Sequence, residues 1–345
     1  MRIPQLDGLR GVAVLLVFCV HIFPVQLPGS FIGVDIFFVL SGFLITSLLL
    51  IEQRESGGIC LRAFYWRRVL RLVPALLVML TLYVAFLPAI FGRDHLIAAA
   101  SSLYAMNWVL AFKLGPAGFL AHTWSLAIEE QFYLLWPMAL ILLLRWGSSR
   151  SLTPILIGSI IAVIVWRLCL QHLGAPVLDR LKCGLDTRAD TLLIGCLLAC
   201  SPRFSQTVGR AWIFAVFFLV AEALFLSEGS PLSPWLFTFT AIAAASIISA
   251  LMSPTTSVLQ QALRIKPIVK LGEISYGFYL WHFVIIYLLQ AETHLRPFIV
   301  GACALVLTIA VSWLSFRFIE KPILRLGRNH YTVLKSRGSM EPVLR

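Results

Sequence analysis

The sequence is poor in charge, and acidic residues are its scarcest charged type. Of 345 residues, 13% are charged and 59% are hydrophobic, and 16 Asp and Glu stand against 28 Lys and Arg. Soluble domains usually carry about 25% charged residues. Most of the long apolar segments also lack the polar face that a helix on a soluble core needs. The composition therefore excludes a soluble domain of any size.

The sequence also lacks a cysteine framework, internal repeats and a signal-peptide cleavage site. Its seven cysteines are scattered, and none has the spacing of metal ligands, so we expect neither disulfides nor a bound metal. No matching pair of Gly- or Pro-broken helices is visible, which counts mildly against an inverted-repeat transporter. Because no small-x-small site follows the first apolar run, we expect that run to be an uncleaved first helix.

Apolar runs long enough to cross a bilayer recur along almost the whole chain. They predict an all-α polytopic membrane protein with about ten transmembrane helices, and residues 95–112 form a re-entrant or interfacial helix or an eleventh span. We expect a membrane domain at 1–325 and a basic cytoplasmic tail at 326–345. The predicted spans are 9–27, 33–51, 72–91, 124–145, 152–172, 190–201, 211–227, 235–253, 274–291 and 298–319.

The distribution of basic residues predicts the orientation of these spans. If the N-terminus is cytoplasmic, most of the 28 Lys and Arg fall on the inner side, as the positive-inside rule requires. Both termini are then cytoplasmic. Residues such as Arg167 and Arg188 fall outside or near the outer surface. Topology thus explains most of the formal charge of +12, and nucleic acid is not needed as a partner.

Ionisable residues inside predicted spans are functional candidates, because burying a charge in a bilayer is costly. Four candidates fall near the outer surface: His21, Asp35, Glu129 and Glu130. Three further charged residues are expected in the same layer: Asp186, Arg188 and Asp190. A histidine near carboxylates can act as a base that an acid orients or stabilises. The competing interpretation is that Asp35, like Asp186 and Asp190, caps a helix N-terminus.

A second, inner group of candidates consists of arginines. Arg10 begins one apolar run, and the segment WRRVLRLVP supplies Arg67, Arg68 and Arg71. On a helix, Arg68 and Arg71 are i,i+3 and Arg67 and Arg71 are i,i+4, so that they share a face suited to binding phosphate. On charge alone, a positive-inside anchor that contacts lipid headgroups is the stronger interpretation.

The first apolar run places one candidate of each group on a single helix face. Arg10 and His21 are separated by a rotation of about 1100°, three turns plus about 20°, and by about 16 Å of helix. This spacing suits a long ligand that crosses part of the membrane, with a phosphate end inside and a reactive end outside.

Six segments, in order, resemble blocks of the acyltransferase-3 family of membrane O-acyltransferases. The resemblance covers Ile3 to Leu324, and the six blocks together are far more specific than any one of them. The segments are LDGLRGVAVLLVFCVHI, GVDIFFVLSGFLIT, FYWRRVLRLVPALL, HTWSLAIEEQFYLLWP, RADTLLIGCLLA and ISYGFYLWHFVII.

The resemblance implies ten transmembrane helices with both ends cytoplasmic and an acyl-CoA donor, commonly acetyl-CoA, reached from the cytoplasm. It implies an acceptor hydroxyl on an extracytoplasmic or lipid-linked carbohydrate. The Arg-x10-His pair of the family falls on Arg10 and His21, and the phosphate interpretation of the arginines then becomes the stronger one. The R-x-x-R motif falls on Arg68 and Arg71, and the Glu-Glu motif falls on Glu129 and Glu130. Since the sequence ends at Arg345, we expect the form without a C-terminal hydrolase-like domain.

We therefore predict a bacterial inner-membrane O-acyltransferase in which His21 is the base. Glu129 or Glu130, or less directly Asp35, would orient His21 or stabilise its imidazolium. Arg10, Arg68 and Arg71, with Arg67 beside them, would hold the CoA phosphates. The alternatives are a transporter or flippase for a glycolipid or acyl carrier, and a non-catalytic membrane subunit. For His282 we favour a structural role, hydrogen-bonded inside the helix bundle.

Overall fold

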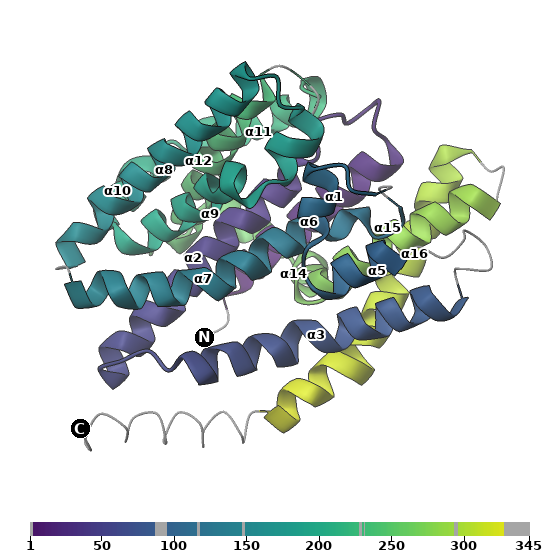
Figure 1. The fold of residues 1–345 in the computed structure, drawn as a ribbon, viewed down its shortest axis with the longest axis horizontal. Helices are drawn as coiled ribbons and strands as arrows, with labels where there is room; N and C mark the ends of the chain where they lie inside the picture. The colour runs from purple at the N-terminus through teal and green to yellow at the C-terminus, as the bar shows by residue number, and fades with distance from the viewer. Residues whose placement is uncertain are drawn as a thin grey trace.

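The protein is a bundle of helices, and the residues described here contain no strand (Figure 1). We describe residues 3–86, 95–115, 118–146, 149–227, 230, 232–292 and 296–327 of a computed structural model. The helices are α1 (Pro4–Ile22), α2 (Ile32–Ser56), α3 (Leu61–Phe86), α5 (His95–Ser102), α6 (Met106–Ala111), η1 (Ala121–Thr123), α7 (Trp124–Trp146), α8 (Ser149–His172), η2 (Val177–Leu181), α9 (Leu185–Cys200), α10 (Pro202–Gly209), α11 (Trp212–Phe225), α12 (Ser233–Met252), α13 (Val258–Leu263), α14 (Lys266–Glu273), α15 (Ser275–Glu292), α16 (Pro297–Ser315) and η3 (Phe316–Glu320).

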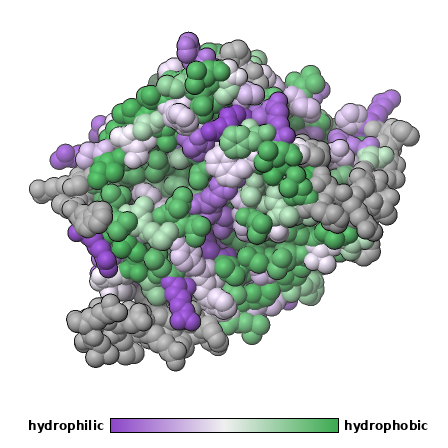
Figure 2. All heavy atoms as spheres, in the orientation of Figure 1, coloured by the Kyte–Doolittle hydropathy of each residue, from purple (hydrophilic) through white to green (hydrophobic). Residues whose placement is uncertain are grey.

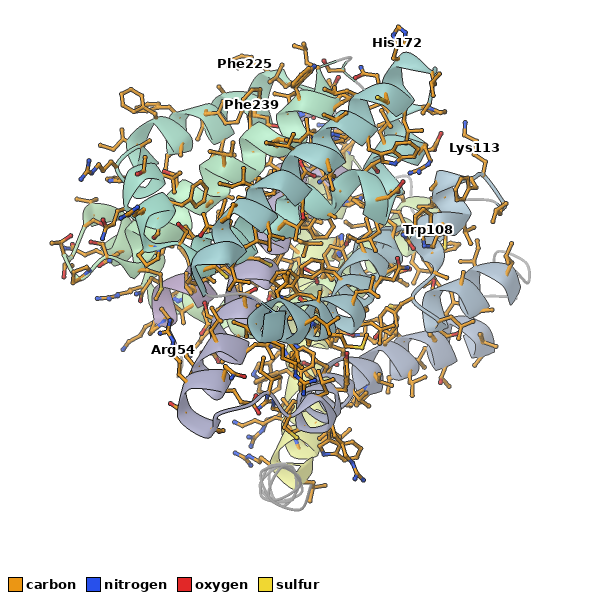
Figure 3. All side chains as sticks on the ribbon, turned by 60° about the vertical axis from the view of Figure 1, so that its left-hand side comes forward. Arg54, Trp108, Lys113, His172, Phe225 and Phe239 are labelled. Atoms are coloured by element: carbon orange, nitrogen blue, oxygen red, sulfur yellow. The ribbon has the colours of Figure 1, made fainter. Side chains whose placement is uncertain are left out.

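The helices confirm the expected all-α polytopic membrane fold. Within the described ranges, seven helices are long and apolar enough to cross a membrane, or up to nine if two bent pairs each form one span. The bends are 68° between α10 and α11 and 78° between α14 and α15. Apolar side chains cover much of the surface, with a band of hydrophilic residues across one face (Figure 2), and Phe225 and Phe239 point outward (Figure 3). The count of ten spans and the cytoplasmic termini remain predictions.

Helix boundaries differ from the predicted spans where charged residues next to an apolar run are also helical. Helix α3 begins at Leu61 rather than at 72, because the arginine-rich segment before the apolar run is itself helical. Residues 95–112 form the short helices α5 and α6, of eight and six residues, and neither is long enough to span a bilayer. The predicted tail at 326–345 lies outside the described residues from 328 on.

Three apolar clusters form the core, and they meet around one cavity. The largest joins α1 and α2 to α7, α8, α9, α11 and α12. A second joins α3, α5 and α6 to α15. The third joins the C-terminal half of α1 to α15 and α16. Helices α1, α2, α3, α7 and α15 contribute to these clusters and also line the cavity described below.

Two ion pairs that are almost completely buried connect helix α9 to α2 and α8. Arg188 pairs with Asp35 of α2, and its guanidinium group lies 3.7 Å from the ring centroid of Phe237. Arg167 of α8 donates to Asp190 across 2.8 Å and is fully buried, so its side chain faces the interior of the bundle, and its expected depth near the outer surface stays a prediction. An exposed position would leave Arg167 in lipid without a counter-charge, whereas Asp190 supplies one inside the bundle.

Glycines allow α2 and α9 to approach closely. An added Cβ at Gly42 would collide with the carbonyl oxygen of Leu192, and one at Gly195 would collide with the carbonyl oxygen of Val39. Small residues at such contacts are typical of membrane helices, because backbones can then pack directly against each other. The close approach places Arg188 within reach of Asp35.

Substituting Gly42 with alanine should lower the unfolding temperature of the purified protein, because overpacking typically costs about 1–3 kcal/mol. The matched control is Gly158→Ala in α8, where an added Cβ meets no neighbour within 4 Å. Thermal unfolding in one detergent measures both variants. Equal unfolding temperatures for Gly42→Ala and Gly158→Ala would show that the α2–α9 contact is not tightly packed.

Candidate functional site

A cavity of about 1050 Å³ lies between α1, α2, α3, α7 and α15. On α2 its lining extends from Val34 to Glu55, a rise of about 32 Å, so the cavity follows most of that helix. The sequence predicted a cavity between the first, second and fourth spans, and α3 and α15 complete the wall. The polar lining residues are Asp7, Arg10, Ser41, Ser47, Glu55, Arg68, Arg71, Ser125, Glu129, Glu130, Tyr133, Ser275, Tyr276 and Tyr279.

Two glycines of α1 determine the direction in which Arg10 points. An added Cβ at Gly8 or Gly11 would collide with the carbonyl oxygen of Leu263 or Ile268, so this face of α1 packs directly on α13 and α14. Arg10 is rotated by about 100° from Gly11 and about 200° from Gly8. It therefore leaves the packed face and lines the cavity.

Helix α3 supplies two cavity arginines, and the neighbouring arginine is directed elsewhere. Arg68 and Arg71 line the cavity, and the guanidinium of Arg68 lies 4.6 Å from the ring centroid of Tyr133. Arg67 instead pairs with Glu52 at 3.4 Å, and Glu52 also accepts a hydrogen bond from the backbone of Cys60. The structure thus separates Arg67, predicted to share the phosphate site, from the cavity.

The three cavity arginines differ from the other buried arginines in their partners. In the part of the chain described here, Arg10, Arg68 and Arg71 form no ion pair, whereas the guanidinium groups of Arg167, Arg180 and Arg188 each pair with a carboxylate. Three guanidinium groups that face one cavity and retain free donors suit a ligand with several anionic oxygens.

The paired glutamates of α7 lie beside these arginines. The carboxylate of Glu129 accepts a hydrogen bond of 2.6 Å from Ser41, and Arg10, Arg68 and Arg71 all act on it electrostatically. Glu130 lines the same cavity and a side pocket of about 240 Å³ that opens between α3 and α7. We had expected both carboxylates in an outer layer with His21. Glu129 instead lies five residues into α7, about 7.5 Å along the helix, at the depth reached by the arginines.

Asp35 has a partner that the sequence analysis had not assigned to it. Its buried carboxylate pairs with Arg188, and Glu222 lies close enough for an electrostatic interaction with the same pair. Asp35 stands in the first turn of α2, where capping was the competing interpretation. The ion pair with α9 gives it a structural function that explains its burial, and its predicted role beside His21 stays a prediction.

His21 lies at the C-terminal end of α1, against His282, which in turn contacts His122. Its ring centroid is 5.2 Å from that of His282 and 4.9 Å from that of Phe283, and His282 is 5.6 Å from His122. Nδ1 of His21 lies 2.7 Å from the carbonyl oxygen of Val17. Since a carbonyl only accepts, Nδ1 carries the hydrogen, and Nε2 of the neutral ring carries the lone pair.

His282 is fully buried and donates from Nδ1 to the carbonyl oxygen of Tyr279 at 2.6 Å, which fits the expected hydrogen bond inside the bundle. Although three histidines meet here, no group of three His, Cys, Asp or Glu among the described residues is arranged to hold a metal ion.

Sequence reasoning missed several polar residues that connect the histidines to the cavity. The hydroxyl of Tyr279 donates to the carbonyl oxygen of His122 at 2.7 Å, and Ser125 lies 2.6 Å from the same hydroxyl. Ser125 and Tyr279 also line the cavity. All of these residues lie in the segments on which the family resemblance rests, but neither charge nor periodicity distinguished them.

Comparison with known proteins gives one family. A family model described as an acyltransferase domain matches residues 3–317. The chain is 37% identical over 95% of its length to the peptidoglycan O-acetyltransferase OatA of Listeria monocytogenes, and 34% identical over 98% to the O-acetyltransferase OatA of Staphylococcus aureus. It covers only 57% and 60% of the lengths of these relatives. No solved structure matches.

The buried pair of Asp35 and Arg188 gives a test of what Asp35 does. Asp35→Asn should destabilise the protein by about 3–5 kcal/mol, because it leaves Arg188 buried without a counter-charge. The double variant Asp35→Asn/Arg188→Met should recover much of that loss. Thermal unfolding of the purified variants measures both effects. An Asp35→Asn protein that unfolds like the wild type but has no activity would assign Asp35 to catalysis instead.

Proposed function

Because the chain belongs to the acyltransferase-3 family, we propose that it is a membrane O-acetyltransferase that moves an acetyl group from acetyl-CoA to a carbohydrate hydroxyl. The name of the Listeria relative, a peptidoglycan O-acetyltransferase, supports peptidoglycan as the acceptor. The acceptor is then extracytoplasmic or lipid-linked, and the protein resides in the bacterial cytoplasmic membrane, the inner membrane of a two-membrane cell.

The observation that carries the proposal is a cavity lined by three arginines, with His21 further along the same helix as Arg10. Arg10, Arg68 and Arg71 offer several guanidinium donors to the phosphates of CoA. His21 lies about 16 Å further along α1 than Arg10. A donor that is anchored by its phosphates and extends outward along α2 would bring its thioester toward His21.

The chemistry requires a base, because a sugar hydroxyl is a weak nucleophile at neutral pH. The hydroxyl oxygen attacks the thioester carbonyl carbon, and Nε2 of His21 takes the hydroxyl proton. The carbon–sulfur bond then breaks, the sulfur leaves as a thiolate and is protonated to CoA-SH, and the acyl group remains on oxygen as an ester. The same base would serve if a protein group carried the acyl group between the two substrates.

Different groups organise the two ends of this site. Glu129, held by Ser41 and surrounded by the three arginines, positions their side chains for the phosphates. At the other end, the hydrogen bond from His21 to Val17 fixes the tautomer that a base needs.

The decisive experiment offers the purified protein acetyl-CoA and peptidoglycan fragments. We expect release of CoA thiol and an acetyl ester on the glycan, detected by mass spectrometry. The transporter alternative is tested in sealed vesicles containing the same protein. Movement of a glycolipid across the vesicle membrane without any ester formation would replace the proposed function.

His21→Ala should abolish acetyl transfer, by a factor of about 100 or more, because a positioned base typically contributes 10²–10⁴-fold. The unfolding temperature should change little, since His21 is only partly buried. His172→Ala, an exposed histidine at the end of α8 (Figure 3), is the matched control and should transfer acetyl normally. Near wild-type turnover in His21→Ala would remove His21 from the role of base.

Arg68→Ala and Arg71→Ala should weaken acetyl-CoA binding by about tenfold or more, since each removes charge-assisted hydrogen bonds worth about 1.5–3 kcal/mol. Lysine at either position should restore binding only in part, because it lacks the planar fork of donors. Isothermal titration with acetyl-CoA measures the change. Arg67→Ala is the comparison, and an equal loss of affinity in that variant would show a general charge effect and contradict a phosphate site in the cavity.

A further inference from the structure

Three half-buried apolar side chains line the end of the cavity that adjoins the cluster between α1 and α15. Val34 and Phe37 are i,i+3 on α2 and share a face, and Leu126 is in the first turn of α7. All three line the cavity, and all three pack against the apolar cluster between α1 and α15. They therefore have the cavity on one side and that cluster on the other.

His21 lies beside that cluster. The cluster contains Val17, whose carbonyl oxygen accepts the hydrogen bond from the His21 ring. Ser41, which donates to Glu129 at the level of the arginines, lies seven residues, about 10 Å, from Val34 along α2. On α2, Val34 and Phe37 therefore stand between the level of the arginines and the cluster beside His21, and on α7 Leu126 precedes Glu129 by three residues.

The polar groups at this end do not change its apolar character. Ser125 and the Tyr279 hydroxyl lie 2.6 Å apart, and that hydroxyl donates to the carbonyl oxygen of His122. Because these groups are bonded to one another, we expect the end of a ligand here to contact chiefly the three hydrocarbon side chains, all of which line the cavity.

We propose that Val34, Phe37 and Leu126 determine which acyl chains the protein transfers, by admitting an acetyl group and excluding longer ones. This inference rests on the proposed function, since it needs an acyl-CoA donor held at the arginines. Each further methylene must fit against side chains that are already packed on their other side. A hydrophobic pocket discriminates one methylene by about 10- to 200-fold.

The test compares acyl donors on the purified full chain with a fixed peptidoglycan acceptor. The kcat/KM values for acetyl-CoA and butyryl-CoA are measured by thiol release and confirmed by the mass of the ester. Leu126→Ala should raise the butyryl-to-acetyl ratio by about tenfold or more. Leu126→Val removes a single methylene, so it gives a smaller rise and decides the matter if Leu126→Ala does not fold.

Two further variants separate the effect of these three side chains from general loosening of the cavity. Leu44→Ala removes the same atoms as Leu126→Ala, from a half-buried residue that lines the middle of the cavity, about 15 Å from Val34 along α2, and should leave the ratio unchanged. Val34→Phe should lower kcat for acetyl-CoA while its affinity stays within about twofold, because the arginines are untouched.

The outcomes distinguish this inference from the function on which it rests. An unchanged ratio in Leu126→Ala and Leu126→Val, with acetyl transfer retained, overturns the inference and leaves the proposed function standing. An equal rise in Leu44→Ala also overturns it. If the wild-type chain transfers no acyl group from any thioester, the proposed function fails, and the inference fails with it.

Discussion

A buried charge in a membrane protein requires a counter-charge, and the arrangement of α9 against α2 and α8 follows from this constraint. Arg188 and Arg167 have no water to solvate them, so Asp35 and Asp190 must lie within reach. The contacts at Gly42 and Gly195 bring the backbones close enough for those pairs to form. One face of α2 is thereby fixed to α9, and the remaining face is held in place as a wall of the cavity.

The arginines of the cavity have no such close partner. Arg10, Arg68 and Arg71 line a partly open cavity and form no ion pair in the described part of the chain, and carboxylates act on them only from a greater distance. The same residue type thus serves two purposes, set by the distance to the nearest carboxylate. An arginine that forms an ion pair with a carboxylate stabilises the fold. An arginine whose N–H groups are not used in an ion pair can bind an anion from outside the protein.

The sequence predicted what depends on local pattern. Apolar runs located a helix at every expected span, and i,i+3 spacing placed Arg68 and Arg71 on one face. It could not predict what depends on distant partners. Arg188 lies 153 positions from Asp35, and no periodicity connects them. Arg67 also shares a face with Arg71 by spacing, and only the position of Glu52 directs it elsewhere. The depth of Glu129 depends on where the cavity lies, and hydropathy carries no information about that.

The hydrogen bond between His21 and Val17 restricts the order of events at the imidazole. Because Nδ1 is bonded to a backbone carbonyl, Nε2 is the nitrogen through which the ring can exchange protons with groups outside α1. A proton gained at Nε2 must depart from Nε2 before another can arrive. If this ring is the proposed base, the acceptor hydroxyl that gives up a proton and the leaving sulfur that receives one must therefore both lie within reach of this one atom.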